Sequence, residues 1–299
     1  MRTRIAVVGM LGALAACSAT PERAPTGGNT PRTGEYAGVP DDATRGDLLR
    51  ASALFLDAQM PVARCSVPPG PVTLRAFRHP RYAVEWSTPV DCGGTPITSG
   101  WVSEADVDYA DAALVPLLTR VPPGPTLSID MAYAGNKIFC DGGMCKINEP
   151  LYGKNRCYLA PAAAVALQRA ALSIARIDSS LRLAVLDCYR PVNVQIEMFK
   201  RVNDPVWVAR PTAPKFGGHN RGVAIDLSIE RSGVMLDMGA PFDAFSAQSN
   251  FDSTVVSAAA RGNRTLLRNT MIAAGFRPYD AEWWHFSYPG ETRAMNFPL

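Results

Sequence analysis

Apolar side chains recur at helical spacing in the C-terminal half of the chain. Residues 161–175 are rich in alanine, carry larger apolar side chains at roughly helical intervals and begin with Pro161, a residue that the first turn of a helix tolerates. Two further helices are expected over 192–202 and 261–274. Gly275 follows the second of them and is a typical helix-ending residue.

Short apolar runs lie between these expected helices. They predict strands over 128–133, 181–188, 223–229 and 282–288. Side chains alternate between the two faces of a strand, so Asp226 shares one face with two small residues while larger aliphatic side chains occupy the other. Helices and strands in irregular order are typical of an α+β fold. We therefore predict a small, mainly antiparallel sheet flanked by helices.

The N-terminus combines basic residues with an apolar run from Ile5 to Ala16, followed by Cys17. Such a run is too short to cross a bilayer and is typical of a secretion signal. The residues around Cys17 resemble the bacterial lipobox, in which the cysteine is acylated; the alternative is an ordinary cleaved signal with an incidental cysteine. Residues 1–17 thus predict an exported bacterial lipoprotein of the periplasm or cell envelope, held at a membrane surface through lipidated Cys17.

Composition divides the rest of the chain into three regions. Residues 18–46 are rich in Pro, Gly, Thr and charge, which predicts a flexible tether. Residues 47–126 carry short apolar runs broken by Pro and Gly, which indicate an N-terminal extension that contains β-structure. The clear alternation of strands and helices starts at Leu127, so 127–299 is the expected functional domain.

The overall composition is that of an ordinary globular protein. Of the 299 residues, 47% are hydrophobic and 19% are charged, and the formal net charge is only +3. No block of Lys or Arg stands out, so the charge pattern fits a solvated surface and gives no reason to expect nucleic acid as a partner.

Six cysteines follow Cys17, and an even number in an exported chain suggests disulfides. A cysteine metal site is the competing interpretation, but an oxidising compartment and a separate His/Asp site make it minor. Spacing alone does not select one pairing among many. The preferred set is local: Cys65–Cys92, Cys140–Cys145 and Cys157–Cys188.

Two of the three histidines lie in segments that look like halves of one metal site. His219 is followed by Asp226 on a predicted strand, and Glu282 precedes His285 in a second one. A catalytic zinc ion takes three nitrogen or oxygen ligands and keeps its fourth position open for water. The remaining carboxylate can then accept a proton from that water. The two segments together predict a zinc hydrolase.

Each of these residues also has a simpler interpretation. Asp226 needs a partner on its apolar strand, and a salt bridge would serve as well as a metal. His219 follows two glycines that let its loop turn back over the strand, although a single His in such a loop is usually a surface residue. Glu282 and His285 would face opposite sides of an ideal strand, so this strand must twist, bulge or end near the metal. The tryptophans between them are expected in the core or in a pocket wall.

Arg190 is left at the end of a strand, because Pro191 cannot extend a central one. A guanidinium in that place would stabilise the oxyanion that forms during hydrolysis. A surface salt bridge is the equally ordinary alternative for Arg190.

Several ordered segments resemble the D-alanyl-D-alanine dipeptidases related to the vancomycin-resistance enzyme. Their order and number make the resemblance specific, whereas a single Glu-x-x-His would be weak. The resemblance covers about residues 127–288. It is carried by segments 187–191, 219–226 and 282–285 and continues through 236–243 and 263–267.

The resemblance implies roles for individual residues. One zinc ion per chain is bound by His219, Asp226 and His285, with Glu282 as the catalytic base. The resemblance also implies that Arg190 stabilises the transition state and that Asp243 holds the free ammonium group of the substrate. Where the family tends to have a serine before the first histidine ligand, this chain has Gly217 and Gly218, so a hydroxyl that contacts substrate is expected to be missing.

The expected function is hydrolysis of the free dipeptide D-Ala-D-Ala by a zinc metallopeptidase. A related alternative is a D,D-carboxypeptidase or an L,D-type endopeptidase that acts on peptidoglycan stem peptides. An alternative from another class is a zinc-containing lipoprotein that binds cell-wall peptides without cleaving them. The spare Glu282 argues against that last alternative, because a structural zinc site is normally closed and needs no base.

Overall fold

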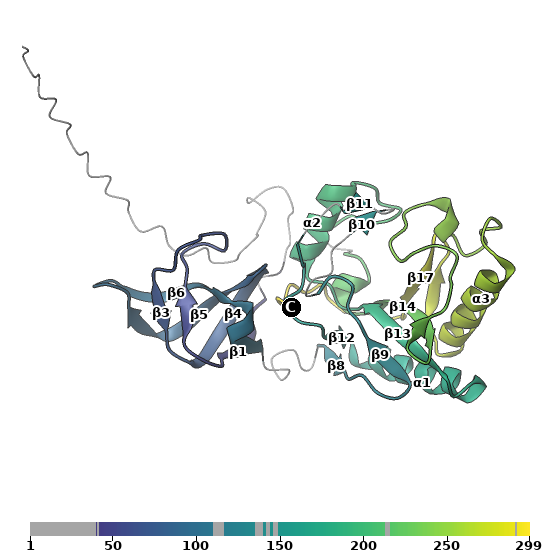
Figure 1. The fold of residues 1–299 in the computed structure, drawn as a ribbon, viewed down its shortest axis with the longest axis horizontal. Coiled ribbons are helices and arrows are strands. Elements are labelled where there is room, and N and C mark those ends of the chain that lie inside the picture. The colour runs from purple at the N-terminus through teal and green to yellow at the C-terminus, as the bar shows by residue number, and fades with distance from the viewer. Residues whose placement is uncertain are drawn as a thin grey trace, which may run out of the picture.

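The computed structural model describes residues 40, 42–109, 117–134, 140–141, 144–145, 149–212, 216–290 and 292–299. The predicted signal with Cys17 and most of the predicted tether lie outside this set. None of the helices in the described ranges is long and apolar enough to span a bilayer. The described chain forms an N-terminal part built on a β-sheet and a C-terminal α+β part (Figure 1).

A five-stranded antiparallel sheet forms the N-terminal part. Its strands, in spatial order, are β6 (Pro96–Ser103), β5 (Arg81–Asp91), β4 (Gly70–Arg78), β1 (Thr44–Leu48) and β7 (Val107–Tyr109). A hairpin of β2 (Ser52–Leu54) and β3 (Cys65–Val67) adjoins it, and the predicted disulfide Cys65–Cys92 joins this hairpin to the end of β5.

The strand β1 corrects the predicted extent of the tether. It begins at Thr44, inside the range 18–46 that composition assigned to a flexible segment. Alternate side chains of β1 are buried, and its backbone pairs with both β4 and β7. Residues 44–46 therefore have the polar composition of a tether but belong to a strand with one buried face.

The boundary predicted at Leu127 also lies too late in the chain. β8 (Thr119–Val121) pairs with β12 (Cys157–Leu159), so the C-terminal part already includes residues 119–121. The two parts are in direct contact, since Arg156 forms an ion pair with Asp108 at 2.7 Å. A sequence pattern cannot show this boundary, because it depends on which distant strand β8 pairs with.

A six-stranded sheet carries the C-terminal part. Along it lie β16 (Arg277–Tyr279), β17 (Glu282–Ser287), β14 (Ala224–Arg231), β13 (Leu181–Asp187) and β9 (Leu127–Ile129), with β15 (Val234–Met235) paired to β14. Only the pairing of β9 with β13 is parallel among the described strands of this sheet. The α+β fold with mainly antiparallel pairing is thus confirmed, but the described chain contains several sheets rather than one small sheet.

One further strand pair bears on the predicted disulfides. β10 (Cys140–Asp141) and β11 (Met144–Cys145) are antiparallel, and Cys140 lies opposite Cys145 in their register. Their side chains are outside the part that the structure describes, so the Cys140–Cys145 bond stays a prediction. The third predicted bond, Cys157–Cys188, is present.

Three α-helices are present in the described chain, and all three were predicted. They are α1 (Pro161–Ile177), α2 (Val192–Val202) and α3 (Ala258–Ala273). α3 begins three residues before its predicted start, because the Ser257 side chain accepts a hydrogen bond from the Ala260 backbone N–H at 3.0 Å and caps the helix there. α1 packs against β13 and α3, whereas α2 lies on the side of the molecule that faces the N-terminal sheet (Figure 1).

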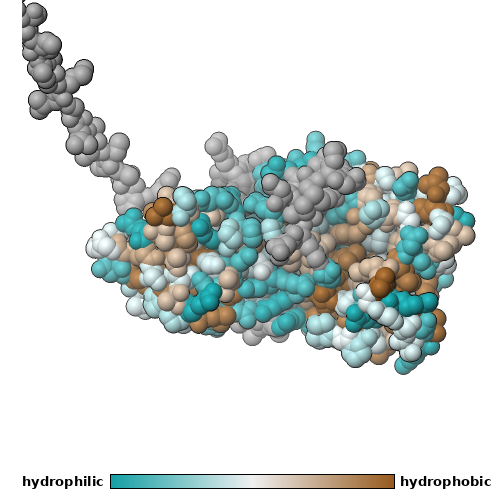
Figure 2. All heavy atoms as spheres, in the orientation of Figure 1, coloured by the Kyte–Doolittle hydropathy of each residue, from teal (hydrophilic) through white to brown (hydrophobic). Residues whose placement is uncertain are grey.

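The buried apolar side chains of both parts join in one large cluster, which includes Leu74 and Tyr82 of the N-terminal sheet and Leu183 and Trp284 of the C-terminal sheet. Large exposed apolar side chains occur mainly as separate residues, such as Val62 and Val255. On the face drawn in Figure 2, hydrophilic residues dominate the middle of the molecule and hydrophobic ones are scattered over both ends.

Candidate metal centre and active-site cavity

Two neighbouring strands and one short turn bring the three predicted metal ligands together. Asp226 on β14 pairs in register with His285 on β17, so their side chains lie next to each other. His219 opens a 3-10 turn (His219–Arg221) just before β14. Gly222 ends this turn with φ of 67°, a conformation that favours glycine, and the chain then enters the strand.

The ligand atoms of these residues form a compact triangle. Asp226 Oδ1 lies 2.9 Å from His285 Nδ1 and 3.4 Å from His219 Nε2, and the two imidazole nitrogens are 3.2 Å apart. Zinc bonds of about 2.0–2.1 Å at tetrahedral angles place ligand atoms roughly 3.3 Å from one another. The donor set and its spacing therefore fit a zinc ion, and Asp226 and His219 are both buried.

Hydrogen bonds orient both imidazoles for this role. His219 Nδ1 donates to the backbone carbonyl of Cys188 at 2.6 Å, which leaves the lone pair of Nε2 facing the other two ligands. His285 Nε2 lies 3.3 Å from Ser287 Oγ, and its Nδ1 faces Asp226. Burial lowers the pKa of His285, which favours the neutral form that a metal requires.

The surroundings of Asp226 favour its ionised form, which can bind a cation. Burial alone would raise the pKa of its carboxyl group, but the adjacent His219 and His285 imidazoles lower that pKa well below its usual value. The carboxylate form is the one that binds a metal. Apart from the two histidines, the salt-bridge partner of Asp226 among the described residues is Arg190, whose Nη2 lies 3.9 Å from Asp226 Oδ2.

A bulge in β17 places Glu282 beside the metal ligands. Pro278 and Tyr279 of β16 are consecutive, yet they pair with Phe286 and Glu282 of β17, so β17 has three extra residues between those two positions. Glu282 Oε2 consequently lies 3.8 Å from His285 Nδ1. The sequence had required a twist, a bulge or a strand end here, and the structure shows the bulge.

Glu282 is buried without being part of the ligand triangle. Burial raises the pKa of its carboxyl group well above the ordinary value, and the nearby carboxylates of Asp226 and Asp243 raise it further. Trp283 and Trp284 between Glu282 and His285 are buried, as expected, and Trp284 also lines the cavity described below.

Arg190 points into the same region and is buried, so the surface salt bridge considered for it is wrong. Its Nε and Nη2 donate to Asp187 Oδ2 at 3.1 and 2.6 Å, and its Nη1 donates to Gln195 Oε1 at 2.8 Å. Burial lowers the pKa of this guanidinium, but Asp187 and the other acidic neighbours outweigh that effect and raise it. Arg190 is therefore a fixed positive charge at the edge of the metal site.

Asp243 lies across the cavity in a left-handed backbone conformation, with φ of 59°. Its Oδ2 accepts a hydrogen bond of 2.6 Å from the Tyr133 hydroxyl. Burial raises the pKa of the Asp243 carboxyl group well above its usual range. A buried acid of this kind is a natural partner for a positively charged ligand group.

A cavity of about 300 Å³ contains all six predicted site residues. Its walls include Trp207 and Phe245, whose rings stack at 5.6 Å, together with Met198 and Trp284. A second cavity of about 360 Å³ lies between β4 and α2, and none of the six residues is among its described lining residues. The chemistry is therefore concentrated in the smaller cavity.

Sequence reasoning missed the residues that hold the site in place. Asp187 was noticed as part of a motif but received no role, and it accepts hydrogen bonds from both Arg190 and the Tyr152 hydroxyl, the latter at 2.9 Å. Gln195 lies on the first turns of α2, five residues after Arg190. Proximity to the motif could have suggested Asp187 and Gln195, whereas nothing local marks Tyr133 or Tyr152.

Comparison with known proteins places the same part of the chain in a functional context. Residues 124–298 match the sequence profile of a family described as "D-ala-D-ala dipeptidase". A D-alanyl-D-alanine dipeptidase of Escherichia coli is 36% identical over 176 residues, which cover 58% of this chain and 84% of that protein. A dipeptidase with the same description from Enterococcus faecalis is 30% identical, over 45% of this chain and 75% of that protein. One from Enterococcus faecium is 39% identical, over 27% of this chain and 43% of that protein.

Proposed function

The chain belongs to the D-Ala-D-Ala dipeptidase family, and on that premise we propose that it is a zinc metallopeptidase that hydrolyses the free dipeptide D-Ala-D-Ala. One observation carries the proposal. Three ligand atoms converge on one point of a buried cavity, and a fourth acidic side chain, Glu282, lies beside them without belonging to the triangle. An open site with a spare base is the arrangement of a catalytic zinc centre.

His219, Asp226 and His285 would hold one zinc ion per chain. When bound, zinc would supply Lewis-acid chemistry, lowering the pKa of water and polarising the scissile carbonyl. Glu282 would accept the proton of the attacking water and then deliver it to the leaving amine. Its raised pKa suits both steps, because the group must hold the proton between them.

Arg190 would stabilise the negative charge that develops on the carbonyl oxygen. Its hydrogen bonds to Asp187 and Gln195 fix the guanidinium before the reaction begins, so little reorganisation is needed at the transition state. Asp243 would bind the free ammonium group of the dipeptide in a charge-assisted hydrogen bond. Placed in one small cavity, the two residues would position the substrate at both the amine and the reacting carbonyl.

Export to the cell envelope, with the chain held at a membrane through lipidated Cys17, is part of this proposal. The disulfides Cys65–Cys92 and Cys157–Cys188 support it, because disulfides persist in oxidising compartments. Metabolic labelling with a fatty acid tests the anchor directly. Loss of the label in Cys17→Ala would support lipidation at this residue, and an unlabelled wild-type chain would contradict it.

Metal removal and reconstitution test the enzymatic function. We expect wild-type protein to bind about one zinc ion per chain, to cleave D-Ala-D-Ala when loaded and to lose activity when the metal is removed. The L,L dipeptide serves as the control substrate. Unchanged activity of the metal-free protein would contradict the proposed chemistry, and cleavage only of longer peptidoglycan stem peptides would favour the carboxypeptidase or endopeptidase alternative. Zinc uptake without cleavage of any of these peptides would favour the binding lipoprotein.

A further inference from the structure

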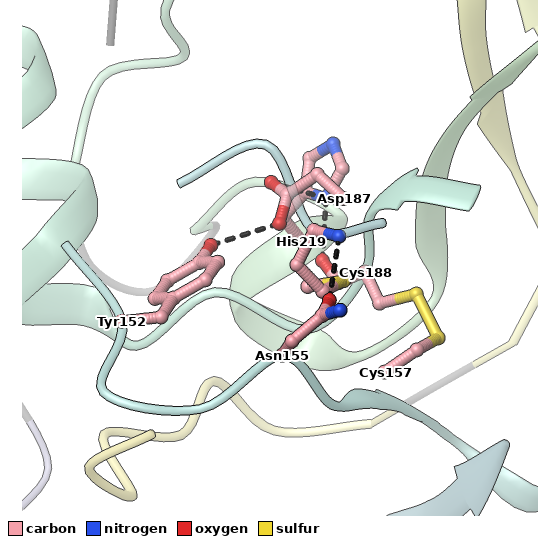
Figure 3. The surroundings of a disulfide bond; sticks show 7 residues. Tyr152, Asn155, Cys157, Asp187, Cys188 and His219 are labelled. Carbon is pink, nitrogen blue, oxygen red and sulfur yellow. Dashed lines mark hydrogen bonds and ion pairs between the residues drawn. A yellow bond between two sulfur atoms is a disulfide. The ribbon is translucent and has the colours of Figure 1, made fainter. Parts of the chain in front are cut away.

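The Cys157–Cys188 disulfide lies beside the segment that contacts His219, one of the three candidate metal ligands (Figure 3). Both cysteines are fully buried, and the bond joins the first residue of β12 to the residue that follows β13. These two strands belong to different sheets, and helix α1 lies between them in the chain. The disulfide thus fixes the point where the chain leaves the central sheet.

This exit point carries three contacts of the active site. The Cys188 carbonyl accepts the hydrogen bond from His219 Nδ1 at 2.6 Å, as the close-up shows (Figure 3). The preceding residue, Asp187, holds the guanidinium of Arg190. The backbone N–H of Arg190 donates to the His219 carbonyl at 3.1 Å, so His219 is bound to this segment through both its side chain and its main chain.

The direction of a carbonyl group is a property of the backbone, so it depends on what holds the backbone at Cys188. Besides the disulfide, one backbone hydrogen bond joins residues 157–159 to 188–189 in the described chain, from Tyr189 N to the Tyr158 carbonyl at 3.0 Å. The disulfide keeps the two Cα atoms 5.4 Å apart. Without it, this single hydrogen bond would have to hold the peptide that contains the Cys188 carbonyl, so the carbonyl could shift while β13 itself stayed in the sheet.

We propose that the Cys157–Cys188 disulfide is a positioning element of the metal centre, which holds the Cys188 carbonyl in place so that His219 presents Nε2 to the metal. This inference rests on the proposed zinc site. Groups that orient a metal-bound histidine typically change metal affinity or activity by about 10–100-fold when they are lost. The disulfide does not contact His219 itself. It acts through the Cys188 backbone carbonyl, which accepts the hydrogen bond from His219 Nδ1.

The test compares two disulfides of the same chain. Cys157→Ala/Cys188→Ala removes the bond beside the segment that contacts His219, and Cys65→Ala/Cys92→Ala removes the bond in the N-terminal sheet as the matched control. Zinc affinity is measured by competition with a chromophoric chelator, and the visible spectrum of the cobalt-loaded protein reports the ligand geometry. We expect about 10–100-fold weaker zinc binding and an altered cobalt spectrum for the first variant, and wild-type values for the control.

A purely structural disulfide would give a different result. It would lower the melting temperature of metal-free and zinc-loaded protein equally, whereas a positioning role reduces the rise in melting temperature that zinc produces. Zinc affinity and a zinc-induced shift equal to those of the wild type would overturn the proposal. A wild-type protein that binds no zinc would instead refute the proposed function itself.

Two further variants test the proposal if the double alanine variant does not fold. Cys157→Val/Cys188→Ala and Cys157→Ala/Cys188→Val each restore part of the buried volume and leave the Cys65–Cys92 disulfide in place. Weakened zinc binding in every variant that folds supports the proposal, and wild-type affinity in any of them contradicts it. If every variant without this bond fails to fold, the disulfide is a general stabiliser and the specific role is rejected.

Discussion

Two buried carboxyl groups in the cavity have pKa values that their neighbours shift in opposite directions. The imidazoles of His219 and His285 lower the pKa of Asp226, whereas burial and the carboxylates of Asp226 and Asp243 raise that of Glu282. Environments that drive two pKa values apart assign different roles to chemically similar groups. Asp226 is therefore suited to remain ionised as a ligand, and Glu282 is suited to take up and release a proton.

Glu282→Gln tests this division of roles. The amide keeps the shape of the side chain but cannot accept the proton, so we expect zinc to stay bound while kcat falls by about 10²–10⁴-fold. Glu197→Gln on α2 is a matched control, because Glu197 lines the other cavity. Steady-state kinetics and metal analysis of both variants check the prediction, and loss of zinc from Glu282→Gln would make Glu282 a ligand.

Asp243 is expected to make the ligand-free protein less stable as the pH rises. Burial raises the pKa of Asp243 in the folded state, so folding favours the protonated form. The stability linked to that form is present below the unfolded-state pKa of about 3.9 and is lost as the pH rises through the folded-state pKa. Asp243→Asn stays neutral and can still accept the Tyr133 hydrogen bond.

The free energy of unfolding should therefore be higher for Asp243→Asn than for the wild type near neutral pH, and the two should converge in acid. Urea unfolding of metal-free protein at several pH values measures this difference. The same substitution should weaken use of the dipeptide, since it removes the charge that binds ammonium. A variant no more stable than the wild type at any pH would mean that Asp243 stays ionised at little cost.

Single residues could be predicted where a motif carries them. All six predicted site residues line one cavity. His219, Asp226, Glu282 and His285 stood out because the chain has only three histidines, whereas Asp243 was implied by the family resemblance. Tyr133 and Tyr152 could not be predicted in this way. Their hydroxyl groups reach Asp243 and Asp187 across more than 30 positions in the chain, and only the tertiary fold creates these contacts.

At the scale of elements, the turn before β14 is the most constrained part of the site. A side chain at Gly218 would place its Cβ 2.8 Å from the Ala224 Cβ, which cannot move without moving the strand that carries Asp226. At Gly217 the nearest atom, the Ala209 Cβ, would be 3.3 Å away. The two glycines thus offer neighbouring positions with different amounts of space.

Gly218→Ala should lower the free energy of unfolding by about 1–3 kcal/mol, the usual cost of overpacking, and should weaken zinc binding because the turn that carries His219 must shift. Gly217→Ala is the control, and we expect a smaller effect on both quantities. Denaturant unfolding and chelator competition provide the measurements. Equal effects of the two substitutions would show that the close approach to Ala224 does not determine the geometry of the turn.

The three helices and the strands β13, β14 and β17 could be predicted from the sequence within a few residues, because apolar periodicity and Pro or Gly mark their ends. The short strands β8, β12, β15 and β16 were not predicted. The spacing of Glu282 and His285 required a twist, a bulge or a strand end in β17, because both residues were expected at one site, and the structure has the bulge. The start of β1 at Thr44 could not be predicted, because its buried positions include small and polar residues such as Thr44 itself.

At the scale of the whole molecule, the family match begins at residue 124, after the N-terminal sheet. That sheet nevertheless shares a hydrophobic cluster and an ion pair with the C-terminal part. The cavity of about 360 Å³ lies between this sheet and α2, and the candidate catalytic groups lie in the cavity of about 300 Å³. The size of the smaller cavity, about 300 Å³, suits a ligand no larger than a short peptide.

The selectivity of the whole enzyme should therefore depend on the free amine of its substrate. N-acylation of D-Ala-D-Ala removes the positive charge and adds bulk next to Asp243, which would be left buried without its partner. The loss of such a charged contact costs roughly 2–5 kcal/mol, so the free dipeptide should be preferred by at least tens-fold in kcat/KM. Asp243→Ala should reduce this preference by slowing cleavage of the free dipeptide while zinc remains bound. Equal or faster cleavage of the N-acylated peptide by the wild type would contradict a dipeptidase and favour a carboxypeptidase.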